Sequence, residues 1–240
     1  MNHIKIIFLL FIACTQTQIF GRTQIPTSNL TVICGSMASG KSDEFIRILR
    51  RIKVAISDNV LIVKHIWDNR KLAGSEKDPS KNIASRSGSS IECIAVNNVQ
   101  EIREMLKIHD YSVIGIDEAQ FFNKEELLTF VREMLALKKT VIIAGLDLDF
   151  RGETFGAMGD LLARADEVIK LKAICSCCKE DRYCITQRII DGQPAYYEDP
   201  IIMVGESTYE ARCSDCHKVV PGKRASTIEM SELNVSAKAL

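Results

Sequence analysis

The sequence has no net charge and no apolar run long enough to cross a bilayer. Lys and Arg together number 31, and so do Asp and Glu, so the chain lacks the overall positive field that favours nucleic acids or membranes as partners. The apolar run near the N-terminus, residues 6–13, is far shorter than the ~20 residues that a spanning helix needs. No internal repeat is present. We therefore expect no nucleic acid and no membrane among the partners, although a local site for either remains open.

From Asn29 onward, expected strands alternate with expected helices. Apolar runs predict strands at residues 29–34, 59–65, 91–96, 111–117, 140–147 and 165–174. The spacing of apolar residues predicts helices at residues 42–53, 99–109 and 123–139, the last opened by Asn123 with Glu126 three residues on. Residues 68–90 are polar, with Gly, Ser and Pro throughout, and predict a long mobile loop.

This alternation is typical of an α/β fold in which helices cover both faces of a parallel sheet. The 240 residues accommodate one such domain and a smaller appendage. We predict an N-terminal extension at residues 1–28, the α/β domain at 29–172, a cysteine-rich appendage at 173–220 and a C-terminal tail at 221–240.

The stretch GSMASGKS, residues 35–42, fits the pattern G-x-x-x-x-G-K-[ST] between an expected strand and an expected helix. Glycines let backbone N–H groups surround an anion, and the helix that follows directs its positive end at the phosphates. In such a loop Lys41 reaches the terminal phosphates and the Ser42 hydroxyl binds magnesium. A Gly/Ser-rich turn without a ligand is the alternative. The pattern predicts a P-loop NTPase-type domain that binds ATP with Mg²⁺.

Two acids follow a later strand, in VIGIDEAQFF. Asp117 ends the apolar run and is in the right position to hold magnesium, directly or through water. Glu118 stands next to it. An ATPase would use this glutamate to activate water, and a kinase would use it to deprotonate an acceptor hydroxyl.

Six of the nine cysteines lie between Cys175 and Cys216. A disulfide framework suits small secreted domains, but here the cluster follows a nucleotide-binding domain. The pairs Cys175-x-x-Cys178 and Cys213-x-x-Cys216 have the spacing of a tetrahedral structural zinc site. Spare thiols at Cys177 and Cys184, and His217 beside the last ligand, leave alternatives for individual ligands open.

Taken together, these motifs resemble the type II thymidine kinases. That family has a phosphate loop, then D-E-A-Q-F-F, then G-L-D-x-D-F-R-G-x-x-F-G, then two cysteine pairs. The counterparts here are GSMASGKS, DEAQFF, GLDLDFRGETFG, and CSCC with CSDC, in the same order from Asn29 to His217. The phosphate loop departs from the family at Ala38, where Phe is usual, and Asp43 replaces a usual Thr.

The resemblance implies a site and its residues. Glu118 would be the general base, and Lys41 and Arg70 the cations, with Arg70 in the short match DNR that also contains Asp68. A third loop, ASRSG with Arg86, is a weaker match. The implied ATP and magnesium residues are Gly35, Ser36, Met37, Ala38, Ser39, Gly40, Lys41, Ser42, Asp117, Glu118, Ala119 and Gln120. The implied nucleoside residues are Met37, Phe121, Leu146, Phe150, Phe155, Thr186 and Tyr209.

In the family the cysteine pairs close a lasso loop over the nucleoside. TQR, with Thr186 and Arg188, resembles its start, and GESTYEARC its end. Ser207 stands where the family has an acid, and Ser214 where it has a basic residue. The resemblance implies transfer of the ATP γ-phosphoryl group to the 5′-hydroxyl of thymidine or deoxyuridine, structural Zn²⁺, a homotetramer and inhibition by dTTP.

Two other functions remain as alternatives. One is a P-loop ATPase whose zinc module binds nucleic acid, although the cysteine region shows no dense stripe of Lys and Arg. The other arises from residues 1–16, which resemble a secretory or lipoprotein signal ending near Cys14. They suggest a catalytically inactive, exported or anchored relative. An exported protein would meet neither ATP nor reduced thiols. We therefore favour a dispensable extension or a start site assigned too far upstream, and expect a cytoplasmic enzyme.

Overall fold

The computed structural model describes residues 29–56, 59–68, 78–202 and 208–223. Its centre is a six-stranded sheet in the order β5-β2-β6-β7-β1-β8, with every neighbouring pair parallel. The strands are β1 (Leu30–Cys34), β2 (Val60–His65), β5 (Ile94–Val96), β6 (Val113–Asp117), β7 (Thr140–Gly145) and β8 (Glu167–Lys170). The four central strands are buried along their whole length, as continuous apolar runs predict.

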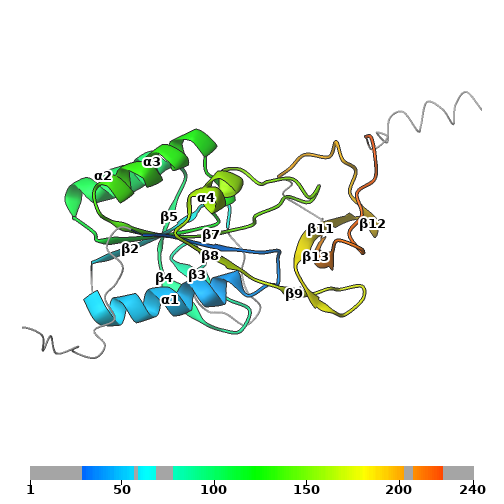
Figure 1. Cartoon of the computed structure of the whole chain (residues 1–240), viewed down its shortest axis with the longest axis horizontal. Coiled ribbons are helices and arrows are strands. Elements are labelled where there is room, and N and C mark those ends of the chain that lie inside the picture. The colour runs from blue at the N-terminus through cyan, green and yellow to red at the C-terminus, as the bar shows by residue number, and fades with distance from the viewer. Residues whose placement is uncertain (1–28, 57–58, 69–77, 203–207, 224–240) are drawn as a thin grey trace, which may run out of the picture.

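Helices cover both faces of this sheet (Figure 1). Helix α1 (Lys41–Ile56) lies on one face, and α2 (Val99–Ile108), α3 (Lys124–Ala136) and α4 (Met158–Arg164) lie on the other. The predicted cap of α3 is present, because the side chain of Asn123 accepts a hydrogen bond from the N–H of Glu126 (3.1 Å). The sequence did not predict α4. The predicted α/β class with a parallel sheet is confirmed.

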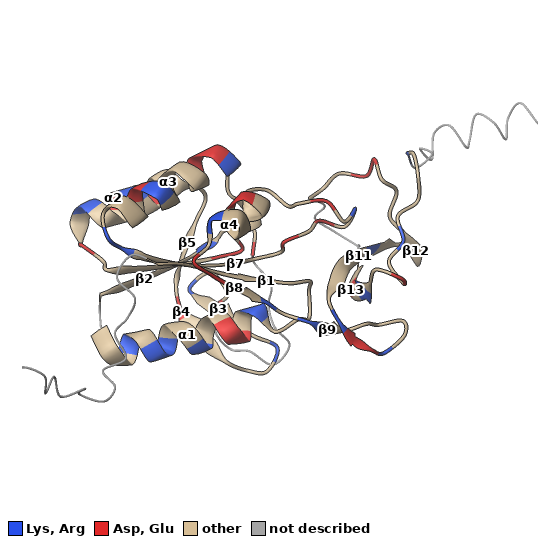
Figure 2. Cartoon of the chain, in the orientation of Figure 1, with Lys and Arg blue, Asp and Glu red and all other residues tan. Residues whose placement is uncertain are grey.

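Charged residues of both signs occur along helices α1, α2 and α3 (Figure 2). Their buried faces form two apolar clusters, one on each side of the sheet. Gly115 in β6 lets α1 come close, because a Cβ atom there would lie 2.9 Å from Leu49 Cδ1. In the described part of the chain, no helix is both long and apolar enough to span a bilayer.

The region from residue 82 to residue 96 differs from the prediction. Instead of one strand at 91–96, the structure has β4 (Ser90–Glu92) and β5, and β4 pairs antiparallel with β3 (Asn82–Ala84). The loop predicted at 68–90 therefore contains half of a hairpin. The N–H of Cys93 donates to Lys81 O (3.0 Å), which keeps β4 in the hairpin before the chain joins the main sheet. Ile83 and Ile91, opposite each other in the hairpin, are buried against α1.

The cysteine-rich lobe, described at residues 173–202 and 208–223, lies beyond the carboxyl ends of the central strands (Figure 1). It is built from short strands, as its sequence predicted: β9 (Ala173–Ile174), β10 (Asp181–Arg182), β11 (Cys184–Ile190), β12 (Gln193–Pro194) and β13 (Thr208–Cys213). The main pairing is antiparallel, between β11 and β13.

Candidate active site

A cavity of about 710 Å³ lies between the carboxyl ends of the central strands and the cysteine-rich lobe. Twelve residues predicted from the sequence line it: Met37, Ala38, Gly40, Lys41, Ser42, Glu118, Phe121, Leu146, Phe150, Phe155, Thr186 and Tyr209. The other predicted ATP and magnesium residues do not line it: Gly35, Ser36, Ser39, Asp117, Ala119 and Gln120. One cavity thus joins the predicted phosphate loop, the predicted base and the predicted nucleoside pocket.

The phosphate loop connects β1 to the start of α1. Gly35 has φ +145°, and a Cβ atom there would lie 2.7 Å from Leu171 O, so only glycine fits. Ala38 adopts the left-handed conformation with φ 63°, so the departure from the family's Phe falls on a strained backbone position. Lys41 Nζ donates to Ser36 O (2.8 Å). The loop is therefore folded back on itself, with the lysine at the N-terminus of a helix, the arrangement that binds phosphates.

Three carboxylates gather beside this loop. Single carboxylate oxygens of Asp68, Asp117 and Glu118 all lie within 4.8 Å of one another. Asp117 ends β6, and Glu118 turns sharply away from it, because its backbone is left-handed with φ 53°. Glu118 lines the cavity, whereas Asp117 is not among the residues that line it.

Gln120 positions the Glu118 carboxylate. Its Nε2 donates to Glu118 Oε2 (2.5 Å), and its Oε1 accepts from the N–H of Leu146 (3.1 Å). The glutamine therefore connects the acid after β6 to the chain that leaves β7. A Cβ atom on Gly145 would lie 2.7 Å from Gln120 Oε1, so the glycine there leaves room for this contact.

Lys64 is a cavity residue that sequence analysis missed. It is the penultimate residue of β2 and pairs with Asp117 in the sheet register. Its side chain is 2% exposed and donates from Nζ to Asp68 O (2.8 Å) and Asp68 Oδ2 (3.3 Å). A buried ammonium group needs such partners. In the sequence, the lysine is one polar residue in an apolar run, and only the β2–β6 register places it among the acids.

Aromatic side chains form one wall of the cavity. The rings of Phe121 and Phe155 meet edge to face with centroids 5.8 Å apart. Trp67, which the sequence analysis also missed, continues this row, 5.7 Å from Phe121, and is 56% exposed. Behind it, His65 accepts a hydrogen bond at Nδ1 from the Trp67 N–H (3.2 Å), and burial lowers the pKa of this imidazole. A neutral histidine thus supports the aromatic wall.

The lobe closes the cavity through β11 and β13. The N–H of Met37 donates to Thr186 Oγ1 (3.0 Å), so this predicted nucleoside residue also holds the phosphate loop. Arg188 and Tyr209 face each other in the β11–β13 register, and both line the cavity. The match to TQR named Arg188 at the start of the lasso without giving it a role in the site, and the structure shows that it lines the cavity.

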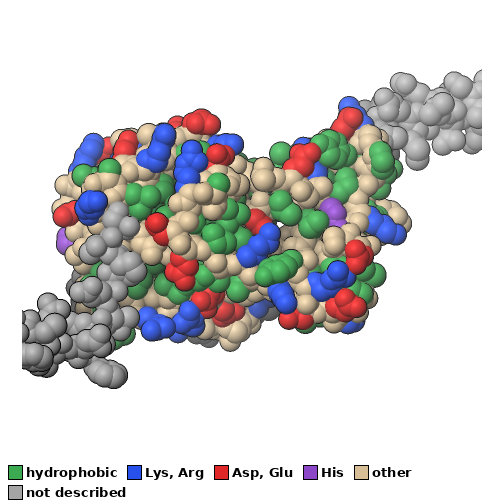
Figure 3. Space-filling view, viewed as in Figure 1, with side chains coloured by type: hydrophobic (Ala, Val, Ile, Leu, Met, Phe, Trp, Pro, Cys, Tyr) green, Lys and Arg blue, Asp and Glu red, His purple; other side chains and the backbone are tan. Residues whose placement is uncertain are grey.

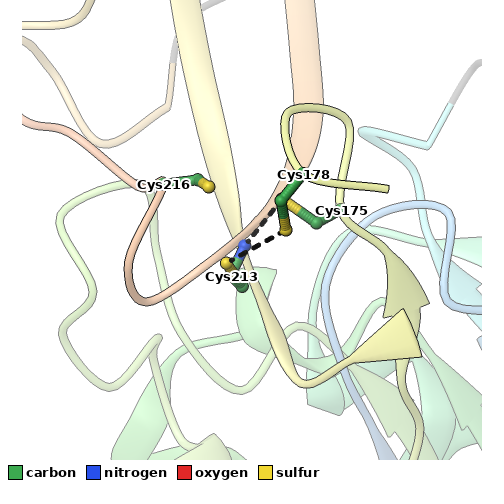
Figure 4. A group of neighbouring side chains, drawn as sticks. All are labelled: Cys175, Cys178, Cys213 and Cys216. Carbon is green, nitrogen blue, oxygen red and sulfur yellow. Dashed lines mark hydrogen bonds between the residues drawn. The ribbon is translucent and has the colours of Figure 1, made fainter. Parts of the chain in front are cut away.

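The four cysteines predicted as metal ligands come together (Figure 4). The sulfur atoms of Cys175, Cys178, Cys213 and Cys216 lie within 4.8 Å of one another. The Cys178 and Cys213 sulfurs are 3.8 Å apart, which matches the ~3.8 Å that tetrahedral Zn–S bonds of ~2.3 Å require. Burial by itself raises the pKa of the Cys175 thiol. Hydrogen bonds from the backbone N–H groups of Cys213, Cys178 and Cys177 outweigh this effect and lower the pKa to about 6. Cys177 is exposed and Cys184 lies outside the group.

Arg70 falls outside the described residues, as do Glu206 and Ser207 near the end of the lasso and most of the predicted terminal segments. The proposed cation at Arg70 therefore stays a prediction. So do the boundaries of the four predicted segments.

Comparison with known proteins identifies relatives. The thymidine kinase family matches residues 28–217. The thymidine kinase of Coprothermobacter proteolyticus is 49% identical over 195 residues, which cover 81% of this chain and 92% of that protein. Among solved structures, domain III of the Thermotoga maritima replication initiation protein DnaA is 15% identical with a TM-score of 0.36, over 60% of this chain and 55% of that chain. The flagellar accessory protein FlaH of Methanocaldococcus jannaschii is 15% identical with a TM-score of 0.39, over 70% of this chain and 76% of that chain.

The two structural similarities are too low to carry an argument. The sequence matches, by contrast, include the phosphate loop, both acids after β6 and all four converging cysteines. The chain belongs to the thymidine kinase family.

Proposed function

We propose that this protein transfers the γ-phosphoryl group of ATP to the 5′-hydroxyl of thymidine, and also of deoxyuridine. One observation carries the proposal: a single cavity is lined by the phosphate loop, by Glu118 and by the Phe121–Phe155 wall. A kinase needs the triphosphate, a base and a flat apolar acceptor pocket within reach of one another. Family membership supports the same reaction.

Each group in the cavity has a role in this proposal. Lys41 holds the terminal phosphates, and the α1 N-terminus adds positive potential. Glu118, oriented by Gln120, accepts the proton of the 5′-hydroxyl as its oxygen attacks the γ-phosphorus and ADP leaves. Arg70 would add a second cation at the transferred group. Thymine would pack against Phe121, Phe155 and the neighbouring apolar residues.

The carboxylate cluster fits magnesium. Asp117 and the Ser42 hydroxyl would hold it, because hard oxygen donors suit Mg²⁺, and Asp68 lies close enough to contribute. When bound, the ion would neutralise charge on the β- and γ-phosphates.

The four converging thiols fit structural Zn²⁺. All four ligand positions are then thiolates, which leaves no open position for chemistry. The ion would join residues 175–178 to residues 213–216 and so close the loop that crosses the cavity. This supports residues 173–220 as the zinc-binding lasso domain, with residues 29–172 as the kinase domain.

The nucleic-acid ATPase alternative finds no support on the face of the molecule that Figure 3 shows. In Figure 3, Lys and Arg side chains alternate with Asp, Glu and hydrophobic groups over both the α/β domain and the cysteine-rich lobe. Nucleic-acid binders instead gather Lys and Arg on one face.

An ADP-release assay with thymidine, deoxyuridine, deoxycytidine or no acceptor tests the proposed function. We expect release with thymidine and deoxyuridine, matched by formation of the nucleoside monophosphate. ADP release that is independent of the acceptor would contradict the proposal, and stimulation of that release by single-stranded DNA would favour the ATPase.

The family resemblance extends the proposal to a homotetramer that dTTP inhibits. It also extends to a cytoplasmic location, where ATP and reduced thiols coexist. Sedimentation of the purified protein and a dTTP titration in the same assay test the first two, and fractionation of cells tests the third.

A further inference from the structure

The β3–β4 hairpin is firmly attached to helix α1. Ile83 and Ile91, which face each other across the hairpin, are buried in one apolar cluster with Phe45, Ile46 and Leu49 of α1. The guanidinium group of Arg50 also donates to Ser90 O (2.8 Å). The hairpin is therefore packed on, and hydrogen-bonded to, the helix whose N-terminus supports the phosphate loop.

The tip of the hairpin, residues 85–89, is held as well. Ser85 and Ser89 exchange two hydrogen bonds, from Ser85 N–H to Ser89 O (2.8 Å) and from Ser89 N–H to Ser85 Oγ (3.1 Å). Gly88 closes the turn with φ +92°. Ser87 Oγ donates to Asp43 Oδ1, in the first turn of α1. These contacts fix the tip beside the start of the helix.

Arg86 lies at this tip and lines the cavity together with Lys41, Ser42 and Asp43. Its side chain is exposed. The other described cations that line the cavity are engaged: Lys41 with Ser36 O, Lys64 with Asp68, and Arg188 with the carbonyls of Pro200 and Ile201. Among the described residues, no hydrogen bond or ion pair to Arg86 is seen.

We infer that Arg86 binds the terminal phosphates of ATP, as a cation supplied by the hairpin to the transferred γ-phosphoryl group. The inference rests on the proposed function, because it takes the ligand of the phosphate loop to be ATP. An exposed arginine that has no partner among the described residues, held at a cavity that receives a highly charged anion, gains most from that anion. Its planar fork fits phosphate oxygens with two parallel hydrogen bonds. The hairpin would then add a cation to a cavity that Lys41 also lines.

Binding of nucleotides to Arg86→Gln tests this inference without relying on turnover. We expect affinity for the non-hydrolysable ATP analogue AMP-PNP to fall about 10-fold or more, the usual effect of losing a charge-assisted hydrogen bond. Affinity for ADP should change less than about twofold, because ADP lacks the γ-phosphate. With thymidine as acceptor, kcat/KM should fall about 10- to 100-fold.

Arg86→Lys keeps the charge but loses the fork, and should lie between the wild type and Arg86→Gln. Arg51→Gln is the matched control, because Arg51 is an exposed arginine of α1 that does not line the cavity. Ser87→Ala removes the contact to Asp43 and keeps Arg86. It should therefore lower the affinity for AMP-PNP by a smaller factor than Arg86→Gln does. Thermal unfolding should be the same for all four variants and the wild type.

AMP-PNP binding by Arg86→Gln equal to that of Arg51→Gln would overturn the inference. An equal loss of affinity for ADP and for AMP-PNP would also overturn it, because Arg86 would then contact a part of the nucleotide other than the γ-phosphate. If the wild type fails to phosphorylate thymidine, the proposed function is wrong, yet the comparison of ADP with AMP-PNP still decides the role of Arg86.

Discussion

The Arg188 guanidinium carbon lies 4.0 Å from the centroid of the Phe150 ring. The same guanidinium donates to the carbonyls of Pro200 and Ile201, and the residue is 2% exposed. It thereby joins three segments: strand β11, the chain after β7, and the start of the loop that continues to β13. One face of Phe150 is thus covered by arginine, so a nucleoside would reach only its remaining surface.

Arg188→Lys should weaken the hold on this loop. A lysine keeps the charge but cannot stack in the same way or donate to both carbonyls with a rigid fork. We expect the KM for thymidine to rise about tenfold, the effect of losing one strong hydrogen bond, with a much smaller change in the KM for ATP. Steady-state kinetics with each substrate varied in turn will measure this. A rise in the KM for ATP alone would show that Arg188 serves the phosphate side.

Glu118→Gln should reduce kcat by about 10² to 10⁴, the usual contribution of a general base. The amide keeps the size of the side chain but cannot take the hydroxyl proton. Binding of ATP and thymidine, measured by calorimetry, should stay close to wild type. Gln120→Leu is the companion variant, because it removes the hydrogen bond that orients Glu118 and should cause a smaller loss of kcat. An unchanged kcat in Glu118→Gln would mean that the proton leaves by another route.

Cys213→Ser should lower the zinc content well below one ion per chain and raise the KM for thymidine more than that for ATP. Without the metal, the loop between the cysteine pairs would have to be ordered at each binding event. Cys177→Ser is the control, because Cys177 is exposed and outside the four-sulfur group. Metal analysis of both purified variants will measure this. Loss of zinc from Cys177→Ser and retention in Cys178→Ser would shift the first ligand pair by one residue.

The stability of the protein should fall as the pH drops below about 6.5, in part because of His65. Burial holds the pKa of this histidine below its usual 6.5, so the unfolded chain takes the proton first. The stabilising contribution is complete above 6.5 and is lost as the pH falls toward the lower pKa of the folded state. His65→Asn can still accept from the Trp67 N–H but does not titrate. Denaturant unfolding at about pH 7.5 and 5.5 should therefore show a smaller drop in this variant, and an equal drop would exclude His65 as a cause.

The sequence revealed the parts of the site that consist of adjacent residues. Lys41 and Ser42 belong to one short motif, and Asp117 and Glu118 follow one apolar run, so local patterns were sufficient. Lys64 could not be found in this way, because its role depends on which strand lies beside β2. A polar residue within an apolar strand has no distinctive local pattern.

The β3–β4 hairpin escaped prediction for a related reason. Its strands are short and surrounded by Ser, Gly and Lys, so no alternation of polar and apolar residues is long enough to indicate a strand. Its stability comes from Ile83 and Ile91 packing on α1, far away in the sequence. Asp43, which replaces the family's usual Thr, accepts a hydrogen bond from Ser87 of this hairpin, a contact that no local pattern could indicate.

The position of β1 between β7 and β8 affects how the protein is made. The N–H of Leu30 donates to the carboxylate of Asp166, 136 residues further along the chain, and its strand pairs with residues from Val141 onward. At ~5–20 residues per second, a ribosome takes roughly 7–27 s to cover that interval. For most of that time the strand that carries the phosphate loop has neither of its neighbours, because β7 is made late in the interval and β8 only after it. The strand has both neighbours only after β8 has emerged, so we expect nucleotide to stabilise the loop only late in folding.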